Sequence, residues 1–210
     1  ASSVEAVARD NGVAVDLSKA MVAHAPLVVA QVNRNMPVTR GGSVIHVDQL
    51  DFLVEGDLPL IEVPRVELNA VSLTIGRHVA SLIDDGMVLH FDPGAISAAT
   101  MRYLDTKRHL GIHTDVLTDD IWRLIVSGAV TNRTKTVYRG KTVATMVLGS
   151  EELYRFVDEH PKIEIHPIEK VNHPFVIARH DRMVSVLTAR SIELSGLARL
   201  GGDDQVAFGS

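Results

Sequence analysis

Short apolar runs alternate along this chain with stretches in which apolar residues recur at helical spacing. The runs rich in valine, isoleucine or leucine predict strands at residues 26–33, 42–47, 87–91, 110–114, 142–149, 162–166, 175–180 and 183–194. Helical spacing is clearest at residues 68–85, which Gly86 follows as a stop. Three further helices are predicted after the Pro-Gly turn within 92–104, at 119–126 before Gly128, and at 150–161 with Ser150 as N-cap.

This alternation predicts an α/β fold with an open, largely parallel sheet and helices on both faces. Two prolines and several acidic residues in the segment 55–67 separate a β-rich part from the helical unit. We therefore place a domain boundary near Val66, which divides the chain into residues 1–65 and 66–210. Because the chain starts at Ala1 instead of a methionine, we expect a fragment of a longer protein.

Composition narrows the classes of protein that fit. With 46% hydrophobic and 22% charged residues the chain has the balance of a globular domain, and its net charge of −5 offers no basic face for nucleic acid. No apolar run approaches the roughly 20 residues that a membrane helix needs. The absence of cysteine excludes disulfides, thiolate metal ligands and thiol nucleophiles. We expect a soluble, cytoplasmic protein that binds neither nucleic acid nor membrane.

The stretch "LGIHTDVLTDD", residues 110–120, carries the densest set of groups that hold or move charge. Ligands of open α/β sheets bind beyond the carboxyl ends of strands, and Asp115 directly follows a predicted strand end. Asp115 is therefore the candidate reactive carboxylate. Alternatively, Asp115, Asp119 and Asp120 serve only turns and caps, where aspartate is common. Thr118 or Asp119 is expected to cap the following helix.

Other candidate groups give weaker signals. The turn around Gly94 in "FDPGAIS" could bring backbone N–H groups to a phosphate or thioester oxygen, or could be a plain strand-to-helix turn. His113 could orient a carboxylate or could be a half-buried strand histidine. His166, His173 and His180 are spaced by seven, but prolines interrupt any helix there, so we expect no metal site. No G-x-S-x-G nucleophile elbow occurs.

Five segments, in order and over nearly the whole chain, resemble the acetyl-CoA hydrolase/transferase family, the class I CoA-transferases that include 4-hydroxybutyrate CoA-transferase. They are "VVAQVNRNMPVTRGGSVIHVDQLDFLVE", "VASLIDDGMVLHFDPGAISAATMRYL", "LGIHTDVLTDDIWRLIVSGAVTNRTKTVYRGK", "LGSEELYRFVDEHP" and "VNHPFVIARHDRMVSV". The resemblance implies a CoA-transferase type of α/β fold built from two similar halves. Residues 1–65 then correspond to the end of the first half and 66–210 to the second.

The resemblance also implies a reaction. A carboxylate attacks an acyl-CoA thioester to give a mixed anhydride and then an enzyme-bound CoA thioester, which a carboxylate acceptor or water releases. The family glutamate stands in a "G-[IV]-H-[TS]-E" context, where this chain has Asp115. Coenzyme A enters as part of the acyl-CoA substrate, and a homo-oligomer is a further possibility. The implied CoA contacts are Gly94, Ala95, Ile96, Asn172, Gly201 and Gly202.

The chain departs from the family pattern at several positions. Aspartate is one methylene shorter than glutamate and reaches about 1.5 Å less, and a misplacement of about 1 Å can cost roughly 100-fold in rate. The family turn "G-x-G-x-[IV]-P" ends here in Ser97, and the C-terminal glycine loop is reduced to Gly201 and Gly202.

Three hypotheses follow from these observations. The first is an enzyme that hydrolyses acyl-CoA or transfers CoA to a carboxylate, with Asp115 as nucleophile. The second is a catalytically silent module that binds CoA or acts as a scaffold within a larger protein. The third is a piece that has lost CoA binding and serves only structure or assembly.

Overall fold

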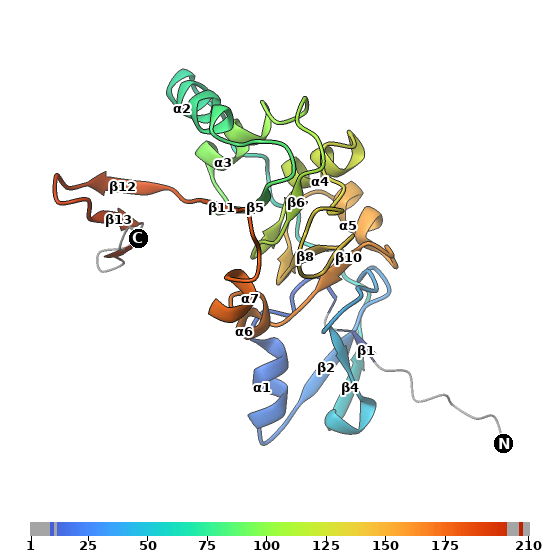
Figure 1. Cartoon of the computed structure of the whole chain (residues 1–210). Helices are drawn as coiled ribbons and strands as arrows, with labels where there is room; N and C mark the ends of the chain where they lie inside the picture. Colours follow the sequence, from blue (N-terminus) through green and yellow to red (C-terminus); the bar gives the residue numbers. More distant parts are fainter. Residues whose placement is uncertain (1–8, 11, 201–205, 208–210) are drawn as a thin grey trace.

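Parallel strands form the framework of the structure, a computed structural model that describes residues 9–10, 12–200 and 206–207 (Figure 1). Two parallel sheets are joined by a bridge between His113 and Val143. The resulting order is β11 (Met183–Val186), β5 (Val88–Phe91), β6 (Gly111–Ile112), β8 (Thr142–Ala144) and β10 (Ile163–Ile165). This arrangement confirms the prediction of an α/β fold with a largely parallel sheet.

Two of these strands continue after a short break. β6 is followed beyond Asp115 by β7 (Val116–Leu117), and β8 is followed beyond Thr145 by β9 (Met146–Val147). β7 and β9 are again parallel to each other. The single strand predicted at residues 142–149 is therefore interrupted at Thr145.

Smaller strand pairs lie outside this sheet. β2 (Val29–Val32) and β4 (Phe52–Glu55) form a parallel pair with exposed apolar side chains that include Val29, Phe52 and Val54. The antiparallel strands are β1 (Arg9–Asp10) with β3 (Val44–Ile45), and β12 (Ala189–Ile192) with β13 (Ala198–Leu200) and β14 (Val206–Ala207). β12 and β13 project from the body in Figure 1.

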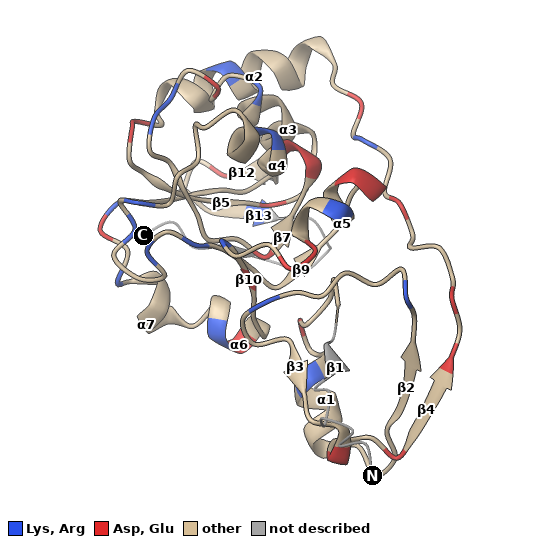
Figure 2. Cartoon of the chain, turned by 90° about the vertical axis from the view of Figure 1, so that its right-hand side faces the viewer, with Lys and Arg blue, Asp and Glu red and all other residues tan. Residues whose placement is uncertain are grey.

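Helices follow most of the strands. They are α1 (Ser18–His24), the 3-10 helix η1 (Val47–Gln49), α2 (Ala70–Ser81), α3 (Ala95–Met101), α4 (Asp119–Val126), α5 (Glu151–Val157), α6 (Ile168–Val171) and α7 (Pro174–Ile177). The predicted cap of α5 is confirmed, since Ser150 Oγ accepts a hydrogen bond from Leu153 N at 3.4 Å. Acidic residues fill the first turn of α5 (Figure 2), where the positive end of the helix dipole stabilises their negative charge.

The buried core lies between the central strands and the helices that follow them. Strand residues are apolar on both faces, as expected for a parallel sheet covered on both sides. The core includes Leu89, Phe91, Ile112, Leu117, Ile121, Val147, Leu153 and Ile165. Val15, from the N-terminal region, is fully buried in the same core, and its N–H donates to Thr145 O at 3.1 Å. Within the described residues, no helix has the length and apolar character to cross a membrane.

One predicted strand is wrong. Residues 175–180 were expected to be extended, but Pro174 begins the one-turn helix α7. Proline suits the first helical position because its fixed φ is helical and its missing N–H is not needed there. His173 caps the turn through Nδ1, which accepts from Phe175 N at 3.3 Å. An apolar run this short has no periodicity that distinguishes a strand from one helical turn.

The packing of α2 on α3 depends on Gly76. A Cβ atom there would come within 2.6 Å of the backbone of Ala99 and Thr100. The two helices can therefore lie this close only with glycine at position 76.

We predict that Gly76→Ala lowers the free energy of unfolding by about 1–3 kcal/mol, because the added methyl group overpacks the contact between the helices. At an exposed helix position the same change would instead raise the free energy of unfolding by about 1 kcal/mol. Denaturant unfolding measures the change, and Arg77→Ala on the exposed side of α2 is the control. An unchanged or higher stability of Gly76→Ala would contradict this close helix contact.

Candidate active site

The candidate site begins at the break shared by the two central strands. The carbonyl oxygen of Asp115 accepts hydrogen bonds from Thr145 N at 2.9 Å, from Met146 N at 3.0 Å and from Thr145 Oγ1 at 2.8 Å. Three donors on one carbonyl fix the backbone where β6 gives way to β7. The side chain of Asp115 therefore leaves the sheet from a rigid point.

The Asp115 carboxylate lies beside a histidine of the neighbouring strand. Asp115 Oδ2 is 3.6 Å from His90 Nε2, and His90 Nδ1 is 3.1 Å from Ser185 Oγ on β11. The Asp115 side chain is 33% exposed and that of His90 is 18% exposed, so the pair is partly shielded from solvent. Neither His90 nor Ser185 was singled out from the sequence.

This environment favours the ionised carboxylate. The His90 ring lowers the pKa of Asp115 below its ordinary value, although burial acts in the opposite direction. Asp115 Oδ1 is buried and accepts no hydrogen bond from any residue in the described part of the chain. A buried carboxylate oxygen without a donor is uncommon in folded proteins, and such groups occur at functional sites.

Asn172, at the end of α6, lies close to Asp115. Its side-chain amide also lowers the pKa of the Asp115 carboxyl. Two residues that the sequence predicts for one site, Asp115 and Asn172, are therefore brought together from positions 57 residues apart.

His113 holds this end of α6 in place. Its Nε2 lies 2.8 Å from Val171 O, and since a carbonyl only accepts, the ring donates. Burial lowers the pKa of His113 to about 4, so the ring is neutral near pH 7. The structure shows no contact that would let His113 orient the carboxylate, which His90 faces instead. Of the two alternatives drawn from the sequence, a buried strand histidine is the closer description.

The Lys135 side chain contacts β6, the strand that leads to Asp115. Its side chain is almost fully buried, at 2% exposure, and Nζ donates to Ile112 O and to Lys141 O, both at 2.7 Å. Burial lowers the pKa of Lys135 to about 7. The Lys135 side-chain nitrogen thus donates to a strand carbonyl three residues before Asp115.

The predicted glycine turn lies at the same edge of the sheet. Gly94 is the N-cap of α3, with Ala95 and Ile96 in the first turn, and it follows the carboxyl end of β5. A Cβ atom on Gly94 would meet Thr188 Oγ1, just beyond β11, at 3.8 Å. The ends of β11, β5 and β6 therefore bring the Gly94 turn and Asp115 to one edge. Gly201 and Gly202 lie outside the described residues.

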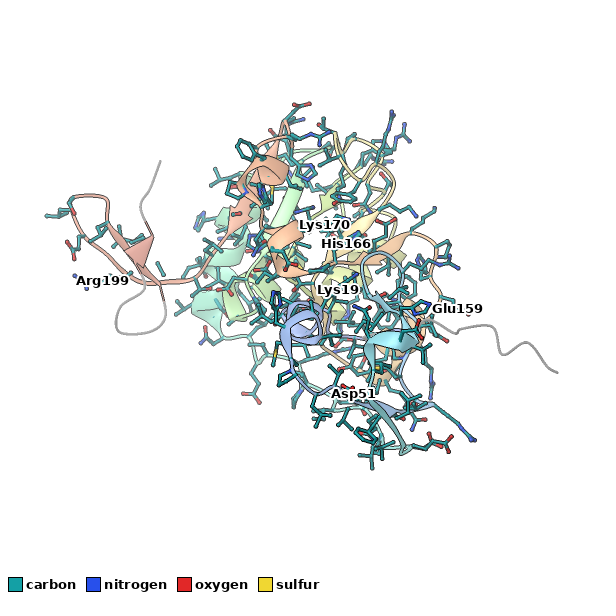
Figure 3. The ribbon with its side chains drawn as sticks, turned by 90° about the horizontal axis from the view of Figure 1, so that it is seen from below. Lys19, Asp51, Glu159, His166, Lys170 and Arg199 are labelled. Carbon is teal, nitrogen blue, oxygen red and sulfur yellow. The ribbon has the colours of Figure 1, made fainter. Side chains whose placement is uncertain are left out.

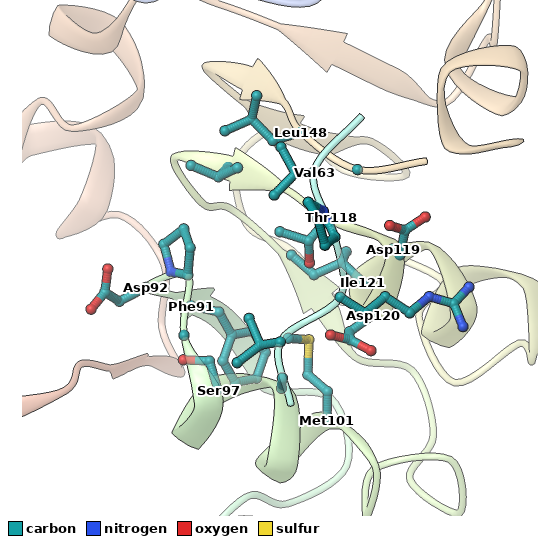
Figure 4. A pocket seen from close by; sticks show the side chains of 18 residues that line it. Val63, Phe91, Asp92, Ser97, Met101, Thr118, Asp119, Asp120, Ile121 and Leu148 are labelled. Carbon is teal, nitrogen blue, oxygen red and sulfur yellow. The ribbon is translucent and has the colours of Figure 1, made fainter. Parts of the chain in front are cut away.

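A cavity of about 110 Å³ opens on the other face of this edge (Figure 4). Phe91, Val116 and the predicted Gly94 line it, whereas His90 and Asp115, which precede Phe91 and Val116 in the chain, do not. Adjacent residues of a strand point to opposite faces, so the cavity and the carboxylate lie on opposite sides of the sheet. Ser97 Oγ and Thr118 Oγ1 are buried at this cavity without a hydrogen-bond partner in the described chain.

The expected cap of α4 is partly wrong. Thr118 occupies the N-cap position, but its side chain makes no capping hydrogen bond. Asp119 instead joins the starts of two helices, because its carboxylate accepts from Ser150 N at 3.1 Å and from Ser150 Oγ at 2.6 Å. The Ser150 hydroxyl, which also caps α5, thus takes the Asp119 carboxylate as its acceptor, so this carboxylate links the two helices.

The three histidines spaced by seven do not converge. His166 lies 3.0 Å from Glu164 and 3.3 Å from Lys170, with Lys19 nearby (Figure 3). His180 packs on His113 with ring centroids 4.8 Å apart. Across residues 9–10, 12–200 and 206–207 no group of three or more His, Cys, Asp or Glu side chains is arranged to hold a metal ion.

Comparison with known proteins identifies the family. Residues 149–202 match the model of the acetyl-CoA hydrolase/transferase C-terminal domain. The chain is 40% identical over 185 residues to 4-hydroxybutyrate coenzyme A transferase of Clostridium kluyveri, covering 88% of this chain and 43% of that protein. The chain belongs to the acetyl-CoA hydrolase/transferase family. This finding confirms the resemblance drawn from the five segments.

Two further members of the acetyl-CoA hydrolase/transferase family support this assignment. Succinyl-CoA:cyclohexane-1-carboxylate CoA transferase of Geobacter metallireducens is 39% identical, with 80% of this chain and 39% of that protein covered. The crystal structure of 4-hydroxybutyrate CoA-transferase from Porphyromonas gingivalis superposes with a TM-score of 0.88 at 39% identity, covering 92% of this chain and 50% of the other. The chain spans about two fifths of the length of the curated relatives it matches.

The lowered pKa of Lys135 predicts how the stability of the protein changes with pH. In the unfolded chain a lysine has a pKa of about 10.4, so between about pH 7 and 10 the unfolded state binds more protons and stability rises with pH. We predict that wild type gains stability relative to Lys135→Met over this window, by at most about 1.4 kcal/mol per pH unit. Urea unfolding at several pH values measures the difference, and a flat difference would contradict a buried, uncharged lysine.

Proposed function

We propose that this chain carries the nucleophile of an enzyme that moves CoA between an acyl-CoA and a carboxylate or water, and that the nucleophile is Asp115. The observation that carries the proposal is the state of its carboxylate. It lies at the break between β6 and β7, is held in its ionised form by the His90 ring, and has one oxygen that no donor among the described residues contacts, while its side chain is one-third exposed. A carboxylate that serves only a turn or a cap would accept hydrogen bonds from nearby backbone N–H groups.

The proposed reaction has three steps. A carboxylate oxygen of Asp115 attacks the thioester carbon, and the C–S bond breaks to leave an acyl-Asp115 anhydride and CoA thiolate. The thiolate then attacks the Asp115 carbonyl carbon, which releases the first carboxylate and forms an Asp115–CoA thioester. In the last step these two reactions run in reverse with the acceptor: its carboxylate attacks the Asp115–CoA thioester and displaces CoA thiolate to form a second anhydride, and the thiolate then attacks the acceptor's carbonyl carbon, which releases the new acyl-CoA and free Asp115. Water that attacks the Asp115–CoA thioester instead releases CoA thiol and free Asp115, which is hydrolysis.

The CoA contacts are part of the proposal. Asn172 is exposed and lies close to the Asp115 carboxylate, so its amide is suited to the thioester end of the substrate. Gly94, Ala95 and Ile96 lie at the same edge of the sheet, where ligands of α/β folds bind. Gly201 and Gly202 remain candidates on the basis of the sequence alone.

The names of the relatives suggest substrates to assay. They include 4-hydroxybutyrate, succinyl-CoA and cyclohexane-1-carboxylate, so we propose small acyl-CoA donors and small carboxylate acceptors for this chain. No metal takes part in the proposed chemistry, because the carboxylate itself supplies the nucleophile.

Turnover of variants tests the proposal. In the full-length protein, Asp115→Asn and Asp115→Ala should lower CoA transfer or hydrolysis by at least about 1,000-fold, because they remove the covalent route. Chromatographic separation of the acyl-CoA products measures the rate. Asp105→Asn, at an exposed aspartate that follows α3 and lies outside the site, is the matched control and should keep the wild-type rate.

Asp115→Glu distinguishes an active scaffold from a silent module. A glutamate restores the family side chain, and the variant should form product at a rate comparable to or higher than wild type. Binding of CoA by wild type and Asp115→Glu with no product from either would contradict the enzyme and favour the silent CoA-binding module.

A further inference from the structure

We propose that His90 is a positioning residue that holds the Asp115 carboxylate in its attacking orientation, and that Ser185 fixes the tautomer of the His90 ring. This inference rests on the proposed role of Asp115 as nucleophile. It adds two residues from neighbouring strands that the reaction scheme does not require. It also explains how a side chain shorter than glutamate is kept in one place.

The direction of each proton follows from the partners. An ionised carboxylate only accepts hydrogen bonds, so the His90 nitrogen that faces Asp115 must carry a proton. In the neutral ring the proton on Nε2 leaves Nδ1 as an acceptor, and the Ser185 hydroxyl, 3.1 Å away, is then the donor. The three groups form a chain in which Ser185 donates to His90 and His90 donates toward Asp115.

The strand register builds this chain into the sheet. Ser185 on β11 and His90 on β5 are Cα partners in the parallel pairing, so their side chains project from the same face. β5 pairs on its other side with β6, which leads directly to Asp115. The row of three side chains therefore runs from β11 through β5 to the bend that follows β6, and backbone hydrogen bonds fix each of these three segments.

The contact between His90 and Asp115 restricts a side chain that would otherwise rotate. The backbone of Asp115 is clamped by Thr145 and Met146, which leaves only its two side-chain torsions free. At 3.6 Å the His90 ring acts on Asp115 Oδ2 mainly as an electrostatic partner. Aspartate is one methylene shorter than the family glutamate, so its carboxylate must be positioned more accurately, since a displacement of about 1 Å can cost roughly 100-fold in rate.

The effect of pH separates positioning from simple packing. The groups that face Asp115 are His90, Asn172 and His113, and the first of these lowers the pKa of the carboxyl most. Asp115 attacks only when ionised, so activity is lost as pH falls through its pKa. Without His90 this pKa is higher, and the acidic limb of the pH profile of kcat/KM moves to higher pH.

The decisive experiment compares His90→Phe, His90→Gln and Ser185→Ala in the full-length protein. We expect His90→Phe to lower kcat by about 10- to 100-fold with a KM within about threefold of wild type, and to move the acidic limb to higher pH. His90→Gln keeps a side-chain N–H donor and should restore most of the rate. Ser185→Ala should move the limb in the same direction by less, while His78→Phe, an exposed histidine of α2, should change neither property.

Two results would overturn the inference while leaving the proposed function intact. They are an acidic limb of His90→Phe that coincides with that of wild type, and a His90→Gln variant as slow as His90→Phe. If the wild-type protein shows no turnover at all, the proposed role of Asp115 as nucleophile is refuted instead.

A measurement without turnover guards against a variant that fails to fold. Nitrogen-15 NMR of wild type at about pH 9, where a histidine is neutral, should show the His90 proton on Nε2 and not on Nδ1. A proton on Nδ1 would leave Nε2 unable to donate to the carboxylate and would refute the positioning role.

Discussion

The site depends on one carbonyl oxygen. Asp115 O accepts hydrogen bonds from Thr145 N, Met146 N and Thr145 Oγ1, and these three contacts interrupt both central strands at the same level. Without the interruption, residues 111–117 and 142–147 would run as two uninterrupted neighbouring strands, with Asp115 simply one more side chain along the first. The break fixes the backbone of that residue while it turns the carboxylate toward β5 and α6. A rigid strand end that carries a partly exposed carboxylate is the arrangement that precise covalent chemistry requires.

The surrounding groups support this strand end from different sides. Lys135 bonds the carbonyl of Ile112 from below, and His113 bonds the carbonyl of Val171, which keeps Asn172 close to Asp115. Both side chains are buried at some electrostatic cost, which their hydrogen bonds to backbone carbonyls offset in part. The cavity lined by Phe91, Gly94 and Val116 does not include the carboxylate, but it shares the Gly94 turn with the proposed CoA contacts. The Asp115 side chain is 33% exposed at this edge of the sheet.

The sequence predicted the fold class, the start and end of α4 and the Ser150 cap of α5, because each has a local signal in apolar spacing or capping chemistry. It also indicated Asp115 as the candidate nucleophile, from its place after a predicted strand and from the family context, and this assignment stays a prediction. His90 and Ser185 could not be found in this way, since their meeting depends on the register of β11 against β5, which no local pattern encodes. The available signal was a polar residue in each of two apolar strands. Asp119 was misassigned for a related reason: its partner Ser150 lies 31 residues away.

The most direct test of the central claim is the location of the covalent bond. The full-length protein is incubated with an acyl-CoA, the enzyme-bound thioester is reduced with borohydride, and the digested peptides are analysed by mass spectrometry. If Asp115 is the nucleophile, the CoA-dependent change occurs at Asp115 and disappears when a carboxylate acceptor is added first. A change at another carboxylate, or turnover without any modified peptide, would contradict that assignment.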